Sequence, residues 1–244
     1  MRECAFCFAT QGLTKEHIIS DWVNGLFPGR SEVNYQDGKG RAEKWHADKI
    51  DWKARVVCRD CNNGWMSDLE STLAKPSLTP LIRGDVDIPI TIELARALAV
   101  FAFKTAVIID HAQRPNPWFP RELRRIFRED QSISTAIQIW ICRINGRRRA
   151  VDFHSGYFSG SLPSGNLYES YVCTVAIGHL VFQVHSGKQT GIYKQIAPLR
   201  THDAVAVPIW PGVPDGAVWP FAGFLDGKAD FNRFWKRWSA VAEI

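Results

Sequence analysis

The chain has 244 residues, of which 45% are hydrophobic and 12% aromatic, enough apolar material for one large domain or two modest ones. This composition excludes disordered and low-complexity proteins. The net charge of +5 is compatible with a nucleic-acid partner without requiring one. The chain begins with no secretory signal pattern and its most apolar window carries charges, so we expect a cytoplasmic protein without a membrane span.

Two Cys-x-x-Cys pairs stand near the beginning of the chain. They consist of Cys4, Cys7, Cys58 and Cys61. A two-residue gap lets both sulfurs of a pair bind one tetrahedral zinc ion at about 2.3 Å. In a reducing compartment this spacing favours metal over disulfides, so we predict one structural Zn²⁺ site; the alternative is two unrelated buried pairs. Cys142 and Cys173 lie in apolar runs and are predicted to be core residues.

Between the cysteine pairs, the segment Leu13–Ser20 has the pattern of a short strand and contains the neighbours Glu16 and His17. On a regular strand these two side chains point to opposite faces, unless the backbone bends there. The following stretch, Asp21–Ile50, is predicted to be a long loop of the kind that is functional or disordered. Its His46 is either an extra metal ligand or a surface histidine.

After the second cysteine pair, the spacing of Trp65, Leu69 and Leu73 predicts a helix. Asn62 directly follows Cys61, so a zinc ion would anchor it at the start of this helix. The amide oxygen of an asparagine can complete the coordination of a divalent cation. Glu70, further along, either coordinates through water or belongs to a solvated helix face.

This order of residues resembles the HNH endonucleases, and especially their zinc-stapled branch typified by endonuclease VII of phage. The shared pattern is Cys-x-x-Cys, then Asp/Glu-His, then Cys-x-x-Cys-Asn, and it covers residues 1 to about 75. The resemblance implies a treble-clef-like ββα-metal fold in which Glu16 and Asn62 hold one catalytic Mg²⁺ or Mn²⁺ and His17 is the general base. Two departures are Glu16, where many members carry Asp, and the absence between Asp51 and Cys58 of the middle Asn that normally orients the base.

On this resemblance we expect a metal-dependent DNA endonuclease that hydrolyses phosphodiester bonds, in restriction, anti-phage defence or a mobile element. A neutral histidine, with an ordinary pKa of about 6.5, suits the removal of a proton from water at neutral pH. One alternative is a catalytically inactive zinc-stapled module that binds nucleic acid or a partner. Another is a nuclease subunit that stays silent until a defence-system partner arrives. A homodimer would suit double-strand cleavage.

The passage after the predicted nuclease segment is rich in helix breakers. They are Pro76, Pro80, Gly84 and Pro89. We therefore predict a boundary or hinge here, with a nuclease domain over 1–75 and a second domain over 76–244. A core helix is predicted near Ile92–Ile109, with Glu93, Arg96 and Lys104 forming its single solvated stripe.

The second domain is predicted to combine helices with a mostly antiparallel sheet, giving an α+β class overall. A short basic helix is expected over Arg121–Arg128, and a terminal helix over Asp230–Ile244. The predicted strands are Ala136–Ile144, Arg149–Phe158, Tyr171–Ile177, Leu180–His185, Ile192–Ile196 and Ala204–Ile209.

Charge counting assigns the basic excess to this second domain. Residues 1–75 hold eleven basic and eleven acidic residues, whereas residues 76–244 hold nineteen and fourteen. Arginines predicted to contact DNA phosphates, unless they only form a solvated face, are Arg121, Arg124, Arg125, Arg147, Arg148 and Arg149. Trp210, Trp219 and Phe221 either line a pocket for a flipped or modified base or pack in the core.

Overall fold

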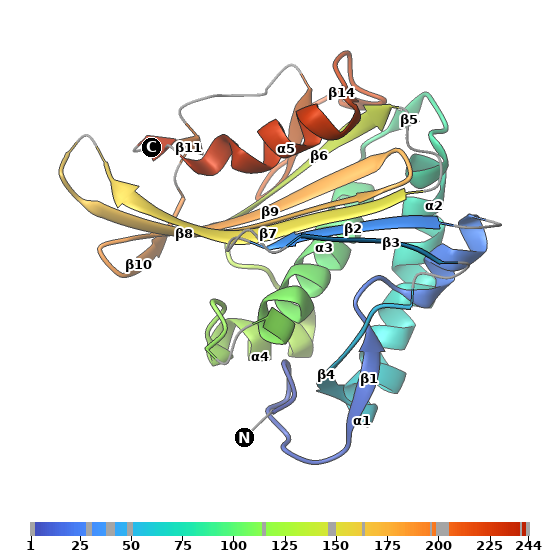
Figure 1. Cartoon of the computed structure of the whole chain (residues 1–244), viewed down its shortest axis with the longest axis vertical. Coiled ribbons are helices and arrows are strands. Elements are labelled where there is room, and N and C mark those ends of the chain that lie inside the picture. The colour runs from blue at the N-terminus through green and yellow to red at the C-terminus, as the bar shows by residue number, and fades with distance from the viewer. Residues whose placement is uncertain are drawn as a thin grey trace.

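The computed structural model has a mainly antiparallel sheet at its centre, with helices on both faces (Figure 1). Helix α5 (Gly227–Trp235) covers one face, and helices α3 (Ile92–Gln113) and α4 (Arg121–Asp130) lie on the other. The predicted mixture of helix and sheet is therefore confirmed. The structure describes residues 3–27, 31–37, 42–47, 51–113, 116–145, 150–162, 164–195, 197–198, 205–239 and 241–242.

The central sheet comprises nine strands within these residues. In spatial order, seven of them are β12 (Ala206–Trp210), β6 (Ile137–Asn145), β9 (Leu180–Gln189), β8 (Leu167–Ile177), β7 (Ala150–Ser161), β2 (Ser31–Asp37) and β3 (Ala42–Ala47). Two short strands extend it: β10 (Ile192–Lys194) pairs with β9, and β14 (Leu225–Asp226) pairs with β6. The β2/β7 and β14/β6 pairs are parallel, and the other pairs within this sheet are antiparallel.

Strands β2 and β3 lie in the stretch that the sequence predicts to be a loop, so this prediction is wrong for them. They form an antiparallel pair at the edge of the sheet, and β2 pairs with β7, more than a hundred residues away in the chain. A strand that depends on so distant a partner is decided by tertiary pairing rather than by local pattern. His46 lies on β3, among residues whose side chains the structure does not describe.

Helix α3 packs against the sheet and is buried along most of its length, as its apolar sequence predicts. The hydroxyl oxygen of Thr91 accepts a hydrogen bond from the amide of Leu94 at 3.2 Å, which satisfies one free N–H of the first turn. The predicted solvated stripe is wrong for Lys104, whose side chain is 0% exposed. A buried lysine needs a partner, and Lys104 finds it in the candidate site described below.

Helix α2 (Lys75–Arg83) occupies the breaker-rich passage that was expected to form a boundary. Pro76 stands at the start of α2, where the chain passes from the π-helical segment Leu69–Ala74 into the α-helix. Pro80 lies inside the helix, which ends at Gly84 in the left-handed conformation, with φ of 85°. The passage therefore contains a helix that stops at a glycine.

The face of the sheet under α5 carries buried polar side chains with defined partners. Oε1 of Gln183 accepts hydrogen bonds from Nε of Arg237 at 2.8 Å and from Nε1 of Trp238 at 2.7 Å. The ring of Trp238 stacks on His185 with a centroid separation of 3.5 Å. Helix α5 ends at Trp235, earlier than the predicted terminal helix, and a 3-10 turn (Lys236–Ser239) follows it.

The N-terminal part of the chain forms a separate two-stranded sheet, made by β1 (Leu13–His17) and β4 (Lys53–Cys58) in antiparallel pairing. A nearly continuous helical path follows β4. It consists of α1 (Arg59–Cys61), two π-helical segments (Asn62–Met66 and Leu69–Ala74) and α2. The remaining elements are the 3-10 helix Asp21–Leu26, the β5 (Ile88–Pro89)/β13 (Val218–Trp219) pair and the β11 (Ala197–Pro198)/β15 (Val241–Ala242) pair.

Residues on both sides of position 75 share one buried apolar cluster. Phe6, between the first two cysteines, lies 6.2 Å from Phe127 of α4 between ring centroids, and Trp65 lies 5.7 Å from the same ring. Phe127 in turn meets Phe103 of α3 edge-on at 4.9 Å. The N-terminal segment is thus packed onto α3 and α4.

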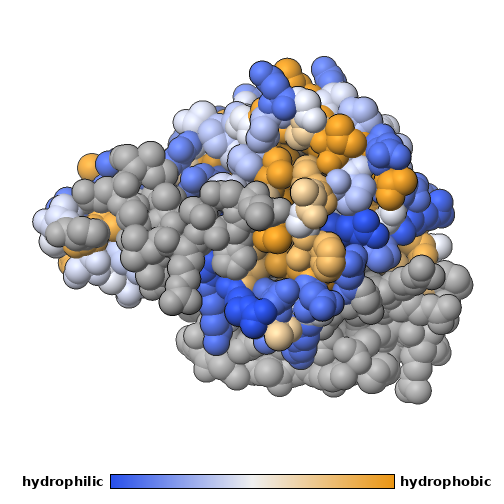
Figure 2. Space-filling view, turned by 90° about the horizontal axis from the view of Figure 1, so that it is seen from above, coloured by the Kyte–Doolittle hydropathy of each residue, from blue (hydrophilic) through white to orange (hydrophobic). Residues whose placement is uncertain are grey.

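The surface on the α5 side mixes hydrophilic side chains with a group of apolar ones near its centre (Figure 2). The β1/β4 pair lies on the α3 side of the central sheet, away from that surface (Figure 1). The cysteine pairs are carried by β4, α1 and the segment before β1, so the candidate site also lies on the α3 side.

Candidate metal centre and adjoining cleft

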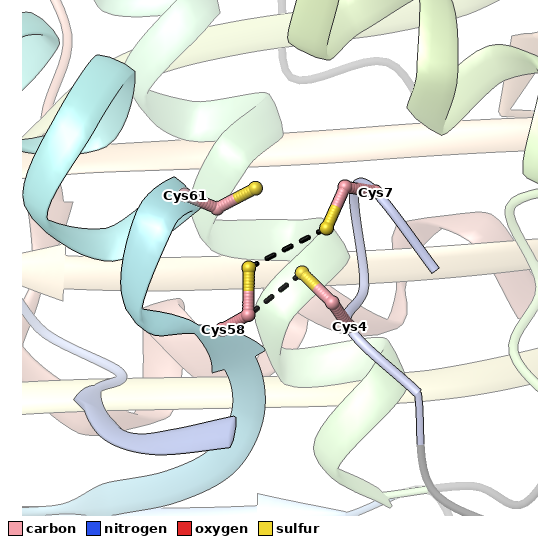
Figure 3. Close-up of side chains that lie close together, drawn as sticks. All are labelled: Cys4, Cys7, Cys58 and Cys61. Carbon is pink, nitrogen blue, oxygen red and sulfur yellow. Dashed lines mark hydrogen bonds between the residues drawn. The ribbon is translucent and has the colours of Figure 1, made fainter. Parts of the chain in front are cut away.

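The four cysteines predicted to bind zinc converge on one point. Sγ atoms of Cys4, Cys7, Cys58 and Cys61 all lie within 4.8 Å of one another (Figure 3). The Cys7 and Cys58 sulfurs are 3.4 Å apart, too far for a disulfide bond of about 2.05 Å. Four sulfurs around one point form the donor set of a closed tetrahedral zinc site, so these residues can hold a metal ion such as zinc.

Backbone hydrogen bonds hold the first cysteine pair against β4. The amide of Ala5 donates to the carbonyl oxygen of Val56 at 2.7 Å, and the amide of Cys58 donates to Sγ of Cys4 at 3.4 Å. On the other side, the carbonyl oxygen of Ala5 accepts a hydrogen bond from Nη1 of Arg124 at 2.6 Å. Chain segments more than fifty residues apart are thereby fixed at the spacing that a shared metal requires.

The thiols already interact as a cluster. A hydrogen bond between Cys61 and Cys4 lowers the pKa of Cys4 to about 4 and raises the pKa of Cys61, while burial raises the pKa of Cys7. One thiolate is thus stabilised by its neighbours, and zinc binding would displace the protons of the others. Cys142 and Cys173 are fully buried elsewhere, which confirms their prediction as core residues.

The three residues of the predicted catalytic set line one cleft. This cleft has a volume of about 350 Å³ and includes Glu16, His17 and Asn62 in its wall. Its other lining residues are Lys15, Ser20, Asp21, Trp22, Asn63, Met66, Ser67, Glu70, Ser71 and Lys75. The structure therefore brings together side chains that lie more than forty residues apart in the sequence.

Glu16 and His17 both line the cleft although they are neighbours on β1. The pairing of β1 with β4 shifts between Thr14 and Glu16, just before these two residues, which then face Ala54 and Lys53 in regular register. Glu16 is 6% exposed, whereas the side chain of His17 is 24% exposed. A buried carboxylate and a solvent-accessible imidazole therefore follow one another at the end of β1.

Asn62 is oriented by a short relay of hydrogen bonds. The hydroxyl of Thr14 donates to the carbonyl oxygen of Val57 at 3.1 Å, and the same hydroxyl oxygen accepts from Nδ2 of Asn62 at 3.2 Å. Because the amide nitrogen is engaged with Thr14, the amide oxygen is the atom of Asn62 that can coordinate a cation.

Glu70 belongs to a buried polar group rather than to a freely solvated helix face. Its Oε1 accepts hydrogen bonds from the hydroxyl of Ser20 at 2.6 Å and from the ammonium of Lys104. Nζ of Lys104 also lies 3.3 Å from Oγ of Ser20. Helix α3 thereby places a positive charge behind the cleft.

The same group sets the protonation of Glu16. Burial raises the pKa of Glu16 to about 7, against the opposing attraction of the Lys104 ammonium and with a further contribution from the negative Glu70. A carboxyl group with this pKa gains its full charge only when a cation lies nearby or when the pH is above neutral.

His17 has an acidic neighbour that the sequence analysis missed. Its Nε2 lies 3.0 Å from Oδ1 of Asp51 and 3.8 Å from Oδ1 of Asp21. Asp51 stands two residues before the start of β4, in the stretch that lacks the middle Asn of the family pattern. Lys104 was missed because its helical spacing suggested a solvated stripe, although it interrupts an otherwise apolar run.

The arginines of α4 have local partners. Arg124 is 3% exposed, and its guanidinium donates to the carbonyl oxygens of Phe119 and Ala5, so a phosphate cannot reach it in this conformation. Arg121 pairs with Glu3, and Arg125 pairs with two glutamates of its own helix. Arg147, Arg148 and Arg149 lie outside the described residues.

The three aromatic residues considered for base recognition do not form one pocket. Trp219 is fully buried and packs edge-on against Phe221 at 5.7 Å between ring centroids. Trp210 lines a smaller cleft of about 110 Å³, with Arg96 and Gln131 among its other residues. Core packing therefore describes Trp219, and the structure gives no shared site for the three.

Comparisons with known proteins add no family assignment. No protein-family model, curated protein or solved structure matches this chain. Among the helices of the described ranges, none combines the length and apolar composition needed to cross a membrane. The site is therefore interpreted from its own residues.

Proposed function

We propose that the chain is a metal-dependent DNA endonuclease of the HNH type. The observation that carries the proposal is the shared cleft of Glu16, His17 and Asn62, set beside the four-cysteine cluster. These residues lie on an antiparallel strand pair and on the helical segment that follows it, the order of elements that a ββα-metal unit requires.

The cysteine cluster fits a structural zinc ion. Four thiolates would fill the tetrahedral coordination sphere and leave no open position, so the zinc would stabilise the fold rather than take part in chemistry. Its binding would join the segment before β1 to the end of β4, and it would thereby fix Asn62, which follows Cys61 directly.

In this proposal the cleft would hold a hard divalent cation such as Mg²⁺ or Mn²⁺. The carboxylate of Glu16 and the amide oxygen of Asn62 are oxygen donors, which such cations prefer. Two protein ligands leave positions for water and for phosphate oxygens. When bound, the cation would neutralise charge on the scissile phosphate and act as a Lewis acid.

The remaining residues of the cleft supply binding and proton transfer. His17 is accessible to water, and its neutral imidazole takes the proton of the attacking water. Lys15 and Lys75 line the same cleft and provide positive charge for the phosphate backbone of DNA. Lys104 donates a hydrogen bond to Glu70 from behind and is not among the residues that line the cleft.

The direct test is cleavage by the purified, zinc-loaded chain. We expect nicking of supercoiled plasmid or cutting of single-stranded DNA with Mg²⁺ or Mn²⁺, and loss of activity in Glu16→Gln. Elemental analysis should find the same zinc content in both proteins, because Glu16 is not one of the four sulfur donors. If the wild type binds DNA but cleaves it under none of these conditions, the chain is instead an inactive binding module.

A further inference from the structure

The strand pairing places Asp51 next to His17. His17, the last residue of β1, lies opposite Lys53, the first residue of β4. Asp51 precedes Lys53 by two residues and therefore stands diagonally across from the histidine, within reach of its ring. The distance of 3.0 Å between Nε2 of His17 and Oδ1 of Asp51 is that of a hydrogen bond.

At neutral pH, this hydrogen bond determines which ring nitrogen of His17 carries a proton. An ionised carboxylate can only accept hydrogen bonds, so Nε2 of His17 must carry the proton. In a neutral imidazole the other nitrogen, Nδ1, then holds the free lone pair. Nζ of Lys53 lies 2.5 Å from the same Asp51 oxygen, and this contact lowers the pKa of Asp51 and keeps it ionised.

We propose that Asp51 is the positioning residue for His17, holding its ring by Nε2–H so that Nδ1 accepts the proton of the attacking water. This inference rests on the proposed nuclease function. It assigns to a carboxylate before β4 the task that the absent middle Asn performs in the family pattern. Asp21 does not share the task, because 3.8 Å is too long for a hydrogen bond to the ring.

The first measurement needs no activity. In the zinc-loaded full chain, ¹⁵N chemical shifts of the histidine side chains report the tautomer of each neutral ring, and the His17→Ala variant identifies the signals of His17. We expect the Nε2–H tautomer in the wild type and a mixture of tautomers in Asp51→Ala. The same mixture in both proteins would overturn the inference.

The second measurement is a set of cleavage rates. Because a positioned base contributes about 10²- to 10⁴-fold, Asp51→Ala should slow cleavage about 10- to 100-fold. Asp51→Asn should recover most of that loss, since its amide oxygen still accepts from Nε2–H. In the His17→Ala background, Asp51→Ala should cause no further loss. The matched control is Asp85→Ala, an exposed carboxylate beyond α2 and outside the cleft lining, which should cleave like the wild type.

The possible outcomes distinguish failure of the nuclease function from failure of the positioning role of Asp51. The wild type could cleave DNA while Asp51→Ala slows cleavage by the same factor in the wild-type and His17→Ala backgrounds. Asp51 would then have a structural role only, and the positioning assignment alone would be overturned. A wild type that cleaves no DNA would overturn the proposed function, and with it any part for Asp51 in cleavage. If Asp51→Ala slows cleavage only when His17 is present, and the wild-type ring is the Nε2–H tautomer, both the nuclease function and the positioning role of Asp51 are supported.

Discussion

The burial of the Glu16 carboxyl group carries an electrostatic cost. The group is nearly buried beside Glu70, and burial raises its pKa to about 7 even though Lys104 lies close enough to oppose the shift. A site that bound no cation would gain little from such a residue. A cation in the cleft would instead favour the ionised form, so the unfavourable burial is consistent with a role in metal binding.

This pKa gives a prediction for stability without added Mg²⁺ or Mn²⁺. The carboxyl group ionises near pH 4.5 in the unfolded chain and near pH 7 in the folded chain. The stabilisation of the folded state by the neutral carboxyl group of Glu16 is therefore complete below pH 4.5. It is lost as the pH rises through 7, and the total loss is about 3 kcal/mol. Urea unfolding of the zinc-loaded protein between pH 5 and 8 measures this loss, against the flatter profile expected for Glu16→Gln. Equal pH profiles for the two proteins would show that Glu16 ionises normally.

Residues with a local signature were predictable, and residues that depend on tertiary contacts were not. The four cysteines and Asn62 stand in a spacing that can be read along the chain, and the cysteine sulfurs do converge. Asp51 and Lys104 became visible only through their contacts with His17 and Glu70. The periodicity of apolar residues in the sequence does not identify an acidic residue before a strand, or a lysine in a buried helix, as part of a functional site.

At the scale of elements, the turn between β8 and β9 rests on the end of α2. Gly178 has a φ of 57°, and the amide of His179 donates a hydrogen bond to the carbonyl oxygen of Ile82 at 3.0 Å. A Cβ atom at position 178 would collide with that carbonyl oxygen and would lie 2.9 Å from the ring of Phe27. The central sheet is therefore fitted directly onto the helix that continues from the candidate site.

Gly178→Ala should destabilise the protein by about 2 kcal/mol or more, because it adds a backbone collision to the cost of a left-handed alanine. Gly165→Ala is the matched control, with φ of 84° and no described atom within 4 Å of the added Cβ. It should cost about 1 kcal/mol, from conformation alone. Thermal or urea unfolding measures both. Equal losses would mean that the turn does not press on α2.

The elements themselves were unevenly predictable. Strands β6 to β9 have long β-branched and aromatic runs, and the predicted ranges overlap them. Helix α2 was not predicted because Pro76 and Pro80 were interpreted as breaks, although both prolines lie within the helix. Strands β2 and β3 were missed because their pairing with β7 is not local.

At the scale of the molecule, the N-terminal segment and the rest of the chain are closely joined. Strands β2 and β3, from within residues 1–75, extend the sheet formed by later residues, and Lys104 of α3 reaches the group behind the cleft. The guanidinium of Arg124 is fixed to the first cysteine pair. The larger C-terminal part therefore supports the candidate site structurally, in addition to any contact it makes with DNA.

Under the proposed nuclease function, the clustered Arg147, Arg148 and Arg149 are candidates for contacts with DNA phosphates, because they belong to the part of the chain that holds the basic excess. Each lost phosphate contact reduces the slope of log binding constant against log salt by about 0.9. Replacing all three arginines with alanine should lower the slope by up to about 3 and weaken binding to all sequences alike. Fluorescence anisotropy at several salt concentrations measures the slope, and an unchanged slope would remove these arginines from the interface.

In the proposed function, His17 is the base of a nuclease whose zinc serves only the fold. The most direct test of this proposal compares plasmid nicking by wild type and His17→Ala in Mg²⁺ or Mn²⁺, with zinc content measured on the same preparations. We predict that the variant is slower by about 10²-fold or more while both proteins keep one zinc per chain. Equal nicking rates in two zinc-loaded proteins would rule out His17 as the base.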